Sequence, residues 1–336
     1  MILAVKGLAT GMLDAQKKRE RGVGADLMIL PSGVSPIGLS TAQLSEKLVG
    51  FVAEQDHVAS ATSMMIYPIK RFDRLTGIDY EGFNSMAQLE WIEGRGLQDR
   101  LDVVIDDFYA SENNIEVGDI FEEINQEWRV VGIFEPGKSA RVLVQKDVLQ
   151  ELTGTIGKVT IIYVKLNDPA TIKESIAALH EKLPEEQYAI YSVEEFVSEF
   201  SASNIPEFQV FLQVMIGFNI VFGFLVVFLT MHMSVLERTR EIGILKSLGA
   251  SPGYILGIFV REAIVLALLG ALTGIAASFG AKQALEIFLP ARMQLAILPS
   301  WWPIATAISA CGALLGVLYP AWKAANHDAL DSLAYE

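Results

Sequence analysis

Residues 234–253 read S-V-L-E-R-T-R-E-I-G-I-L-K-S-L-G-A-S-P-G, and this stretch decides the fold. Two long apolar runs flank it, so we expect the segment to lie at a membrane face rather than in a soluble core. Three of its apolar residues recur at three-residue spacing and predict one side of a short amphipathic helix. These residues are Ile242, Leu245 and Leu248, and the polar side carries Glu237, Arg238, Arg240, Glu241 and Lys246.

The chain is predicted to turn back after this helix. Gly249 is well placed as a C-terminal cap, and Ser251 followed by Pro252 is typical of an N-cap and the first residue of a new helix. Two interpretations of the segment remain open: a solvated connector, or a docking element for a partner. The apolar stripe favours docking, because a connector without a partner gains nothing by presenting three apolar side chains together.

The run E-R-T-R-E-I-G-I-L-K-S-L-G-A at 237–250 resembles the cytoplasmic loop of the FtsX-like permeases, the group that contains the MacB and LolC/LolE transporters. The run Y-P-A-W-K-A-A-N-H-D-A-L-D-S-L at 319–333 is similar to the last segment of the same family. In that family the loop is a coupling helix that docks on a cytoplasmic ATP-binding cassette ATPase. The resemblance implies this role for residues 237–249, with the contact residues Glu237, Arg238, Glu241, Ile242, Leu245, Lys246, Leu248 and Gly249.

The composition indicates a hybrid of a membrane-embedded part and a soluble part. Of the 336 residues, 51% are hydrophobic, too many for an ordinary soluble protein, yet 20% are charged, too many for a purely embedded one. Residues 22–207 hold 31 acidic and 14 basic residues, a net charge of −17, whereas the rest of the chain carries +3. This acidity argues against nucleic acid as a partner. The single cysteine, Cys311, excludes a disulfide within the chain.

The acidic part is predicted to be an α+β extracytoplasmic domain, residues 22–207, built on a split βαβ plan. A strand at 26–30, an amphipathic helix at 41–55 and a strand at 58–66 form the first half. A strand at 159–166, a helix starting at Asp168-Pro169 and a strand at 188–191 form the second. Between them, residues about 68–157 are predicted to form an inserted β-rich subdomain. The resemblance implies that this domain is a MacB-like periplasmic core domain.

Residues 208–336 are predicted to form an α-helical transmembrane domain. Apolar runs at 208–233, 263–281 and 301–319 are long enough to span, and the second span can begin earlier. Basic residues in the connector and near the C-terminus indicate that both are cytoplasmic. The resembled family has four spans, so residues 1–21 are interpreted as the end of a truncated first helix and a stalk. We therefore expect an upstream extension that completes a helix ending near Leu13.

No catalytic constellation or metal cluster is predicted, and the chain is not expected to be an enzyme. No G-x-x-x-x-G-K-[ST] motif occurs, so ATP and Mg²⁺ would be bound by a separate ATPase subunit, with no cofactor in this chain. Two small-x-x-x-small faces in the spans predict close helix contacts, either within the chain or in a dimer. These faces are Gly270 with Gly274 and Gly312 with Gly316.

The resemblance implies a permease subunit that couples ATP hydrolysis by a partner ATPase to movement of the extracytoplasmic domain. Two modes of action are expected for such a subunit: export, and mechanotransmission of the lipoprotein or lipid type. The partners implied are the ATPase, a second permease subunit that is identical or different, a periplasmic adaptor and membrane lipid, in the bacterial inner membrane. The alternative is an FtsX-like membrane regulator that activates a cell-wall hydrolase. The size of the outer domain and its repeated βαβ plan favour the transporter.

Overall fold

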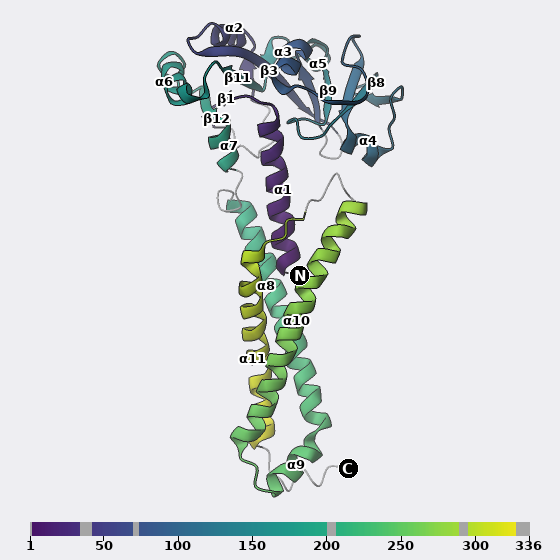
Figure 1. Cartoon of the computed structure of the whole chain (residues 1–336), viewed down its shortest axis with the longest axis vertical. Coiled ribbons are helices and arrows are strands. Elements are labelled where there is room, and N and C mark those ends of the chain that lie inside the picture. The colour runs from purple at the N-terminus through teal and green to yellow at the C-terminus, as the bar shows by residue number, and fades with distance from the viewer. Residues whose placement is uncertain (1, 34–41, 70–73, 200–205, 289–294, 327–336) are drawn as a thin grey trace. The chain divides into compact units, whose positions relative to one another are not determined.

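The computed structural model describes residues 2–33, 42–69, 74–199, 206–288 and 295–326 (Figure 1). The chain forms two compact units. The sheet unit consists mainly of residues 12–204, and the span unit consists of residues 1–11, 205–288 and 293–336. Helix α1 (Ile2–Gly22) contributes residues to both units.

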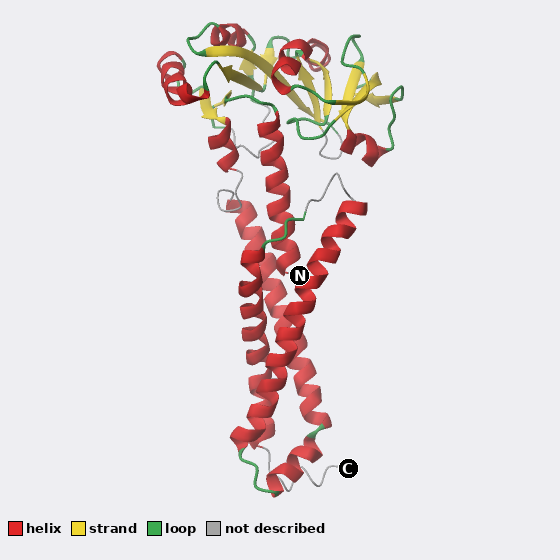
Figure 2. Ribbon diagram, in the orientation of Figure 1, coloured by secondary structure: helices red, strands yellow, loops and turns green. Residues whose placement is uncertain are grey.

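The sheet unit contains both strands and helices (Figure 2), and its strand order includes the predicted split βαβ motif. Its four strands lie in the order β12-β1-β11-β3, and every neighbouring pair is antiparallel. Each strand pair that a helix connects is therefore separated by one further strand, which confirms the predicted plan. The elements are β1 (Leu27–Pro31), α2 (Lys47–Ala53), β3 (Val58–Pro68), β11 (Ile161–Leu166), α6 (Ile172–Lys182) and β12 (Tyr188–Ser192).

Side chains of the inner strands alternate between two apolar layers, as the pleat of a strand requires. On β1, Leu27 and Ile29 pack in the layer that contains Leu48 and Val52 of α2. Met28 packs with Tyr163 of β11 in the opposite layer. Both faces of these strands are buried, so they are hydrophobic throughout rather than alternating with polar residues.

The first predicted helix is shorter than the sequence suggests. It was expected over 41–55, with Leu44, Leu48, Phe51 and Val52 on its apolar face. Instead, Leu44 and Ser45 form a short strand, β2, that pairs with β10 (Lys158–Val159) more than 100 residues later. This long-range pairing takes the residues that local periodicity assigns to the helix, and Phe51 is left exposed.

The inserted segment extends the same sheet instead of forming a separate one. Strand β4 pairs with β3 in antiparallel register, Met64 opposite Ile78, and the order continues β4-β9-β6-β8-β5, with β7 beside β8. Residues of both halves share one apolar layer, for example Met28 and Phe134. The elements are β4 (Arg74–Ile78), α3 (Tyr80–Ala87), β5 (Trp91–Gly94), β6 (Asp102–Asp106), α4 (Asp107–Asn113), β7 (Ile120–Glu123), β8 (Gln126–Phe134), β9 (Val142–Gln145) and α5 (Lys146–Thr153).

The span unit contains three helices that are long and apolar enough to cross a membrane: Phe208–Glu237, Pro252–Leu285 and Pro299–Lys323. They belong to α8 (Pro206–Glu237), α10 (Pro252–Phe288) and α11 (Trp302–Asn326), and each contains one of the predicted spans. Helix α10 begins at the predicted N-cap and proline, well before residue 263. Helix α11 packs along both α8 and α10, whereas α8 and α10 touch each other little.

The isolated sheet unit should be more stable when the end of α1 is included. Leu13 packs against its core, and Glu20 and Val23 are buried in it. We expect a 12–204 fragment to melt cooperatively in circular dichroism. A 22–204 fragment should melt about 5–10 °C lower, since it lacks about 2–3 kcal/mol of packing. Equal melting temperatures would show that α1 contributes nothing to this core.

Candidate functional site: the α9 connector

Helix α9 (Thr239–Ser247) joins the ends of α8 and α10 in the span unit. Its start is a local break in the backbone, with Arg238 as the N-cap residue. The Thr239 hydroxyl donates to the carbonyl oxygens of Val235 at 3.0 Å and Leu236 at 2.8 Å, which satisfies groups at the end of α8.

The end of α9 is a Schellman motif. Gly249 has φ of +93°, where a residue with a Cβ is strained. Its N–H donates to the Lys246 carbonyl at 2.9 Å, and the Ala250 N–H donates to the Leu245 carbonyl at 2.9 Å. The Ser251 Oγ then accepts from the Tyr254 N–H at 3.3 Å as α10 begins. The structure therefore agrees with the capping roles predicted for Gly249 and for Ser251-Pro252.

The predicted apolar stripe is divided between an inner and an outer face. Ile242 is 6% exposed and packs with residues of α8, α10 and α11, so it faces its own chain rather than a partner. Leu245 is half-buried. Leu248 is 80% exposed, and the exposed apolar residue beside it is Ile244, which the sequence analysis did not single out.

Helix geometry explains this division. Successive residues turn by about 100°, so residues three apart drift by about 60° per step and Ile242 lies about 120° from Leu248. Residues four apart differ by only about 40°, which puts Ile244 and Leu248 on one face. The sequence shows that Ile244 and Leu248 are four residues apart, but it does not show which face of α9 packs against the other helices.

The same segment carries several charged residues. Glu237, Arg238, Arg240 and Glu241 are exposed, while Lys246 is half-buried. Arg238 forms an ion pair with Glu262 of α10 at 3.4 Å, a partly exposed contact that contributes about 0–1 kcal/mol. Exposed apolar and charged side chains thus occur together on this short segment, as they do at protein interfaces.

The four glycines predicted to pack helices have different surroundings. A Cβ on Gly316 would lie 3.2 Å from the Phe228 nitrogen and 3.2 Å from Val227 Cγ1, so this glycine allows α11 to approach α8 closely. Within the described residues, a Cβ on Gly312, Gly270 or Gly274 would meet nothing within 4 Å. Intramolecular packing thus accounts for Gly316, and dimerisation through the others stays a prediction.

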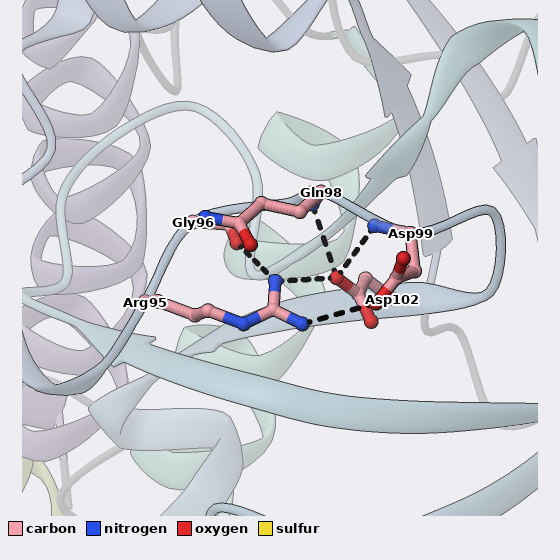
Figure 3. A network of polar contacts seen from close by, with 5 residues as sticks. All are labelled: Arg95, Gly96, Gln98, Asp99 and Asp102. Atoms are coloured by element: carbon pink, nitrogen blue, oxygen red, sulfur yellow. Dashed lines mark hydrogen bonds and ion pairs between the residues drawn. The ribbon is translucent and has the colours of Figure 1, made fainter.

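The polar network around Asp102 in the sheet unit is structural. Asp102 is buried, and its Oδ2 accepts from Arg95 Nη1 at 2.6 Å, Gln98 N at 3.0 Å and Asp99 N at 2.9 Å (Figure 3). Burial acts to raise the pKa of Asp102, but these hydrogen bonds hold it below its ordinary value. The network closes the loop between β5 and β6. Across the described ranges, no three His, Cys, Asp or Glu residues are placed to hold a metal ion.

An α+β sheet unit joined to three apolar helices, with a capped connector between the first two, defines a class of multispan membrane proteins. The chain matches the model of the MacB-like periplasmic core domain over residues 1–182 and that of the FtsX-like permease C-terminal domain over residues 214–329. The chain belongs to the family of FtsX-like permeases with a MacB-like periplasmic core domain. This membership agrees with the predicted inner-membrane location and extracytoplasmic domain.

Similar proteins come from both prokaryotic domains. An uncharacterized ABC transporter permease of Methanocaldococcus jannaschii is 28% identical over 73% of this chain and 65% of its own length. The macrolide export ATP-binding/permease protein MacB of Chromobacterium violaceum is 30% identical over 52% of this chain and 27% of its own length. The chain thus spans less than two thirds of these relatives. The solved periplasmic region of MacB from Actinobacillus actinomycetemcomitans is 18% identical, covering 52% of this chain and 92% of that one, with a TM-score of 0.41.

Residues 319–326 of the C-terminal motif lie in α11, and residues 327–333 lie outside the described residues.

Replacing Gly316 with valine should weaken the bundle, because the added atoms collide with the backbone of α8. We expect a cost of about 1–3 kcal/mol and a lower melting temperature of the detergent-solubilised chain. Gly270→Val is the matched control, since its side chain enters open space. Equal melting temperatures would contradict the close α8–α11 contact, whereas a lost dimer in Gly270→Val alone would favour dimerisation through α10.

Proposed function

We propose that this chain is the permease subunit of an ATP-binding cassette transporter, and that α9 couples it to a separate ATPase. The sequence contains no P-loop, so in this proposal ATP hydrolysis is supplied by an ATPase outside these 336 residues. Relatives are named as ABC transporter permeases and as a macrolide export ATP-binding/permease protein, which supports the class of system. In this proposal α9 faces the cytoplasm, in line with the basic residues of the connector.

The observation that carries the proposal is the exposed pair Ile244 and Leu248 on a helix that is otherwise fixed in place. A side chain that is 80% exposed at a capped helix end is a suitable anchor for an apolar groove on a partner. The surrounding charges would set the orientation of docking more than its strength. The ATPase contact would therefore centre on Ile244 and Leu248, with Ile242 excluded from it.

Ile242 would have the complementary role of transmitting movement. It belongs to one buried cluster with residues of α8, α10 and α11, so in this proposal a displacement of α9 would be passed to the ends of the spans through that cluster. Full burial of one such side chain is worth about 1.5–3 kcal/mol. ATP-driven closure of the partner would thus reach the span helices, and through them the extracytoplasmic domain.

Changing Leu248 or Ile244 to Asp should release the ATPase without unfolding the permease. We expect the ATPase activity that co-purifies with the tagged chain from its native membranes to fall at least about tenfold, equivalent to 1.4 kcal/mol. The melting temperature should not change, because neither side chain is buried.

Two variants serve as controls. Ile156→Asp makes the same change at a 77% exposed residue of the sheet unit and should retain the ATPase. Ile242→Ala should lower the melting temperature, since it removes a buried contact at a cost of about 2–5 kcal/mol. Full retention of ATPase activity by folded Leu248→Asp and Ile244→Asp chains would overturn the proposed contact.

A further inference from the structure

The last turn of α1 is built into the core of the sheet unit. The Arg19 carbonyl accepts from the Ser139 N–H at 2.9 Å. Gly22 lies against the Gly137 carbonyl so closely that no Cβ fits there. Val23, the next residue, is fully buried in the layer shared by both halves of the sheet. This helix end is therefore held by backbone contacts and packing, in addition to its side chains.

Glu20, in the middle of this turn, is a carboxyl group buried among neutral donors. Glu20 is only 6% exposed. Oε1 accepts from Gln16 Nε2 at 2.9 Å, and Oε2 accepts from the Tyr163 hydroxyl at 3.0 Å and from Ser139 Oγ at 3.4 Å. Tyr163 Oη and Ser139 Oγ are themselves 3.1 Å apart, which closes a small polar network.

No salt bridge to a cation is formed by Glu20 within the part of the chain that the structure describes. Among the described residues, the charged groups that act on this region are Arg19 on α1, Arg74 on β4, Asp106 at the end of β6, and Arg141 before β9. Tyr163 of β11 is the remaining titratable group in contact. Arg141 is already paired with Glu112 at 3.3 Å, so it is not a dedicated partner of Glu20.

The neighbouring Arg21 shows the opposite arrangement. It donates from Nε to Glu194 Oε1 at 2.8 Å and from Nη2 to Oε2 at 2.6 Å, in an exposed ion pair with α7 (Val193–Glu199). One residue of the turn thus pairs a solvated charge, while the adjacent one buries a carboxyl that forms no direct ion pair among the described residues. A buried carboxylate without a direct ion pair is costly, whereas the neutral acid fits this set of contacts.

We propose that Glu20 is a protonation switch that controls how firmly α1 is anchored in the sheet unit. With the carboxyl neutral, the last turn of α1 remains seated against Tyr163 and Ser139. When the carboxyl ionises, the charge is driven toward water, and the turn loosens from the core. The switch acts in α1, the helix whose residues are divided between the two units. The ligand that it binds is a proton.

The expected direction of the pH effect follows from the surroundings. Burial raises the pKa of Glu20, and hydrogen bonds from Tyr163, Gln16 and Ser139 offset only part of this rise. A carboxyl whose pKa is raised by folding stabilises the folded state at low pH, and this stability is lost as the pH rises through the raised value. Tyr163 stays a donor throughout, because burial raises its pKa well above the ordinary value.

Asp106 titrates in the same region and must be separated from Glu20. Burial raises its pKa to about 6, against the hydrogen bond from Tyr109 N and the attraction of Arg141 and Arg19. Its contribution persists when Glu20 is replaced, so the difference between the wild type and a Glu20 variant isolates the switch. The inference does not depend on an ATPase partner, and its test can fail independently of the proposed function.

The test is hydrogen exchange of the full-length chain in detergent, from about pH 5 to about pH 9, corrected for intrinsic exchange rates. Peptides covering 16–23 and 161–166 should lose protection as the pH rises, by up to about tenfold for each pH unit until the raised pKa of Glu20 is passed. Glu20→Gln keeps the shape and the acceptor oxygen but cannot ionise, so it should abolish this part of the pH dependence.

Two further variants make the outcome decisive. Glu194→Gln is the matched control, because it makes the same change at the exposed ion pair and should leave the pH dependence unaltered. Tyr163→Phe removes a donor that favours the ionised form, so the loss of protection should extend to higher pH. A flat profile in the wild type, or the same profile in the wild type and Glu20→Gln, would overturn the proposal.

Discussion

The packing of Ile242 in the buried cluster of the span unit holds the connector in place. Helix α9 has only nine residues, too few to be a stable helix in isolation, so its structure depends on tertiary contact. Ile242 supplies such contact, because it is buried in a cluster with residues of α8, α10 and α11. The Schellman turn at Gly249 and the cap at Ser251 then determine where α10 starts. The outward direction of Ile244 and Leu248 is a consequence of this inward anchor.

The sheet unit is governed by a different constraint, the continuity of one sheet through an insertion. Because β3 is long, it can pair with β11 at one end and with β4 over its remaining residues. The insert therefore needs no core that is wholly its own, and it shares an apolar layer with the split βαβ motif. The end of α1 packs into that shared layer, so any distortion of α1 acts on both halves at once.

Sequence predicted the features that depend on local chemistry. Capping residues at Gly249 and Ser251-Pro252, apolar runs of spanning length, and strands bounded by turn residues all have short-range signals. Features that depend on contacts between distant segments were not predictable. Leu44 and Ser45 leave the expected helix because Lys158 and Val159 pair with them, and Ile242 turns inward because of residues on three other helices.

Glu20 illustrates the same limit at a single residue. It lies in a basic segment, between Arg19 and Arg21, where the sequence suggests an exposed helix end. Its environment is created by Tyr163, which is 143 positions away in the chain. No local pattern reports such a contact. The parallel pairing of β4 with β9 and of β6 with β8 inside the insert is hidden from the sequence for the same reason.

The order of strands in the split motif has a consequence for how the chain folds. Among the described residues, β1 pairs only with β11 and β12, which lie at least 130 positions later, whereas β3 finds a partner in the adjacent β4. Strand β1 therefore cannot pair with β11 or β12 until almost the entire domain has been synthesised. Such non-local pairing slows folding and leaves strand edges open to other chains in the interval. Because Tyr163 lies on β11, the hydrogen bond between Tyr163 and Glu20 can form only in this last step, so the anchoring of α1 that begins with contacts to residues 137–139 is completed late.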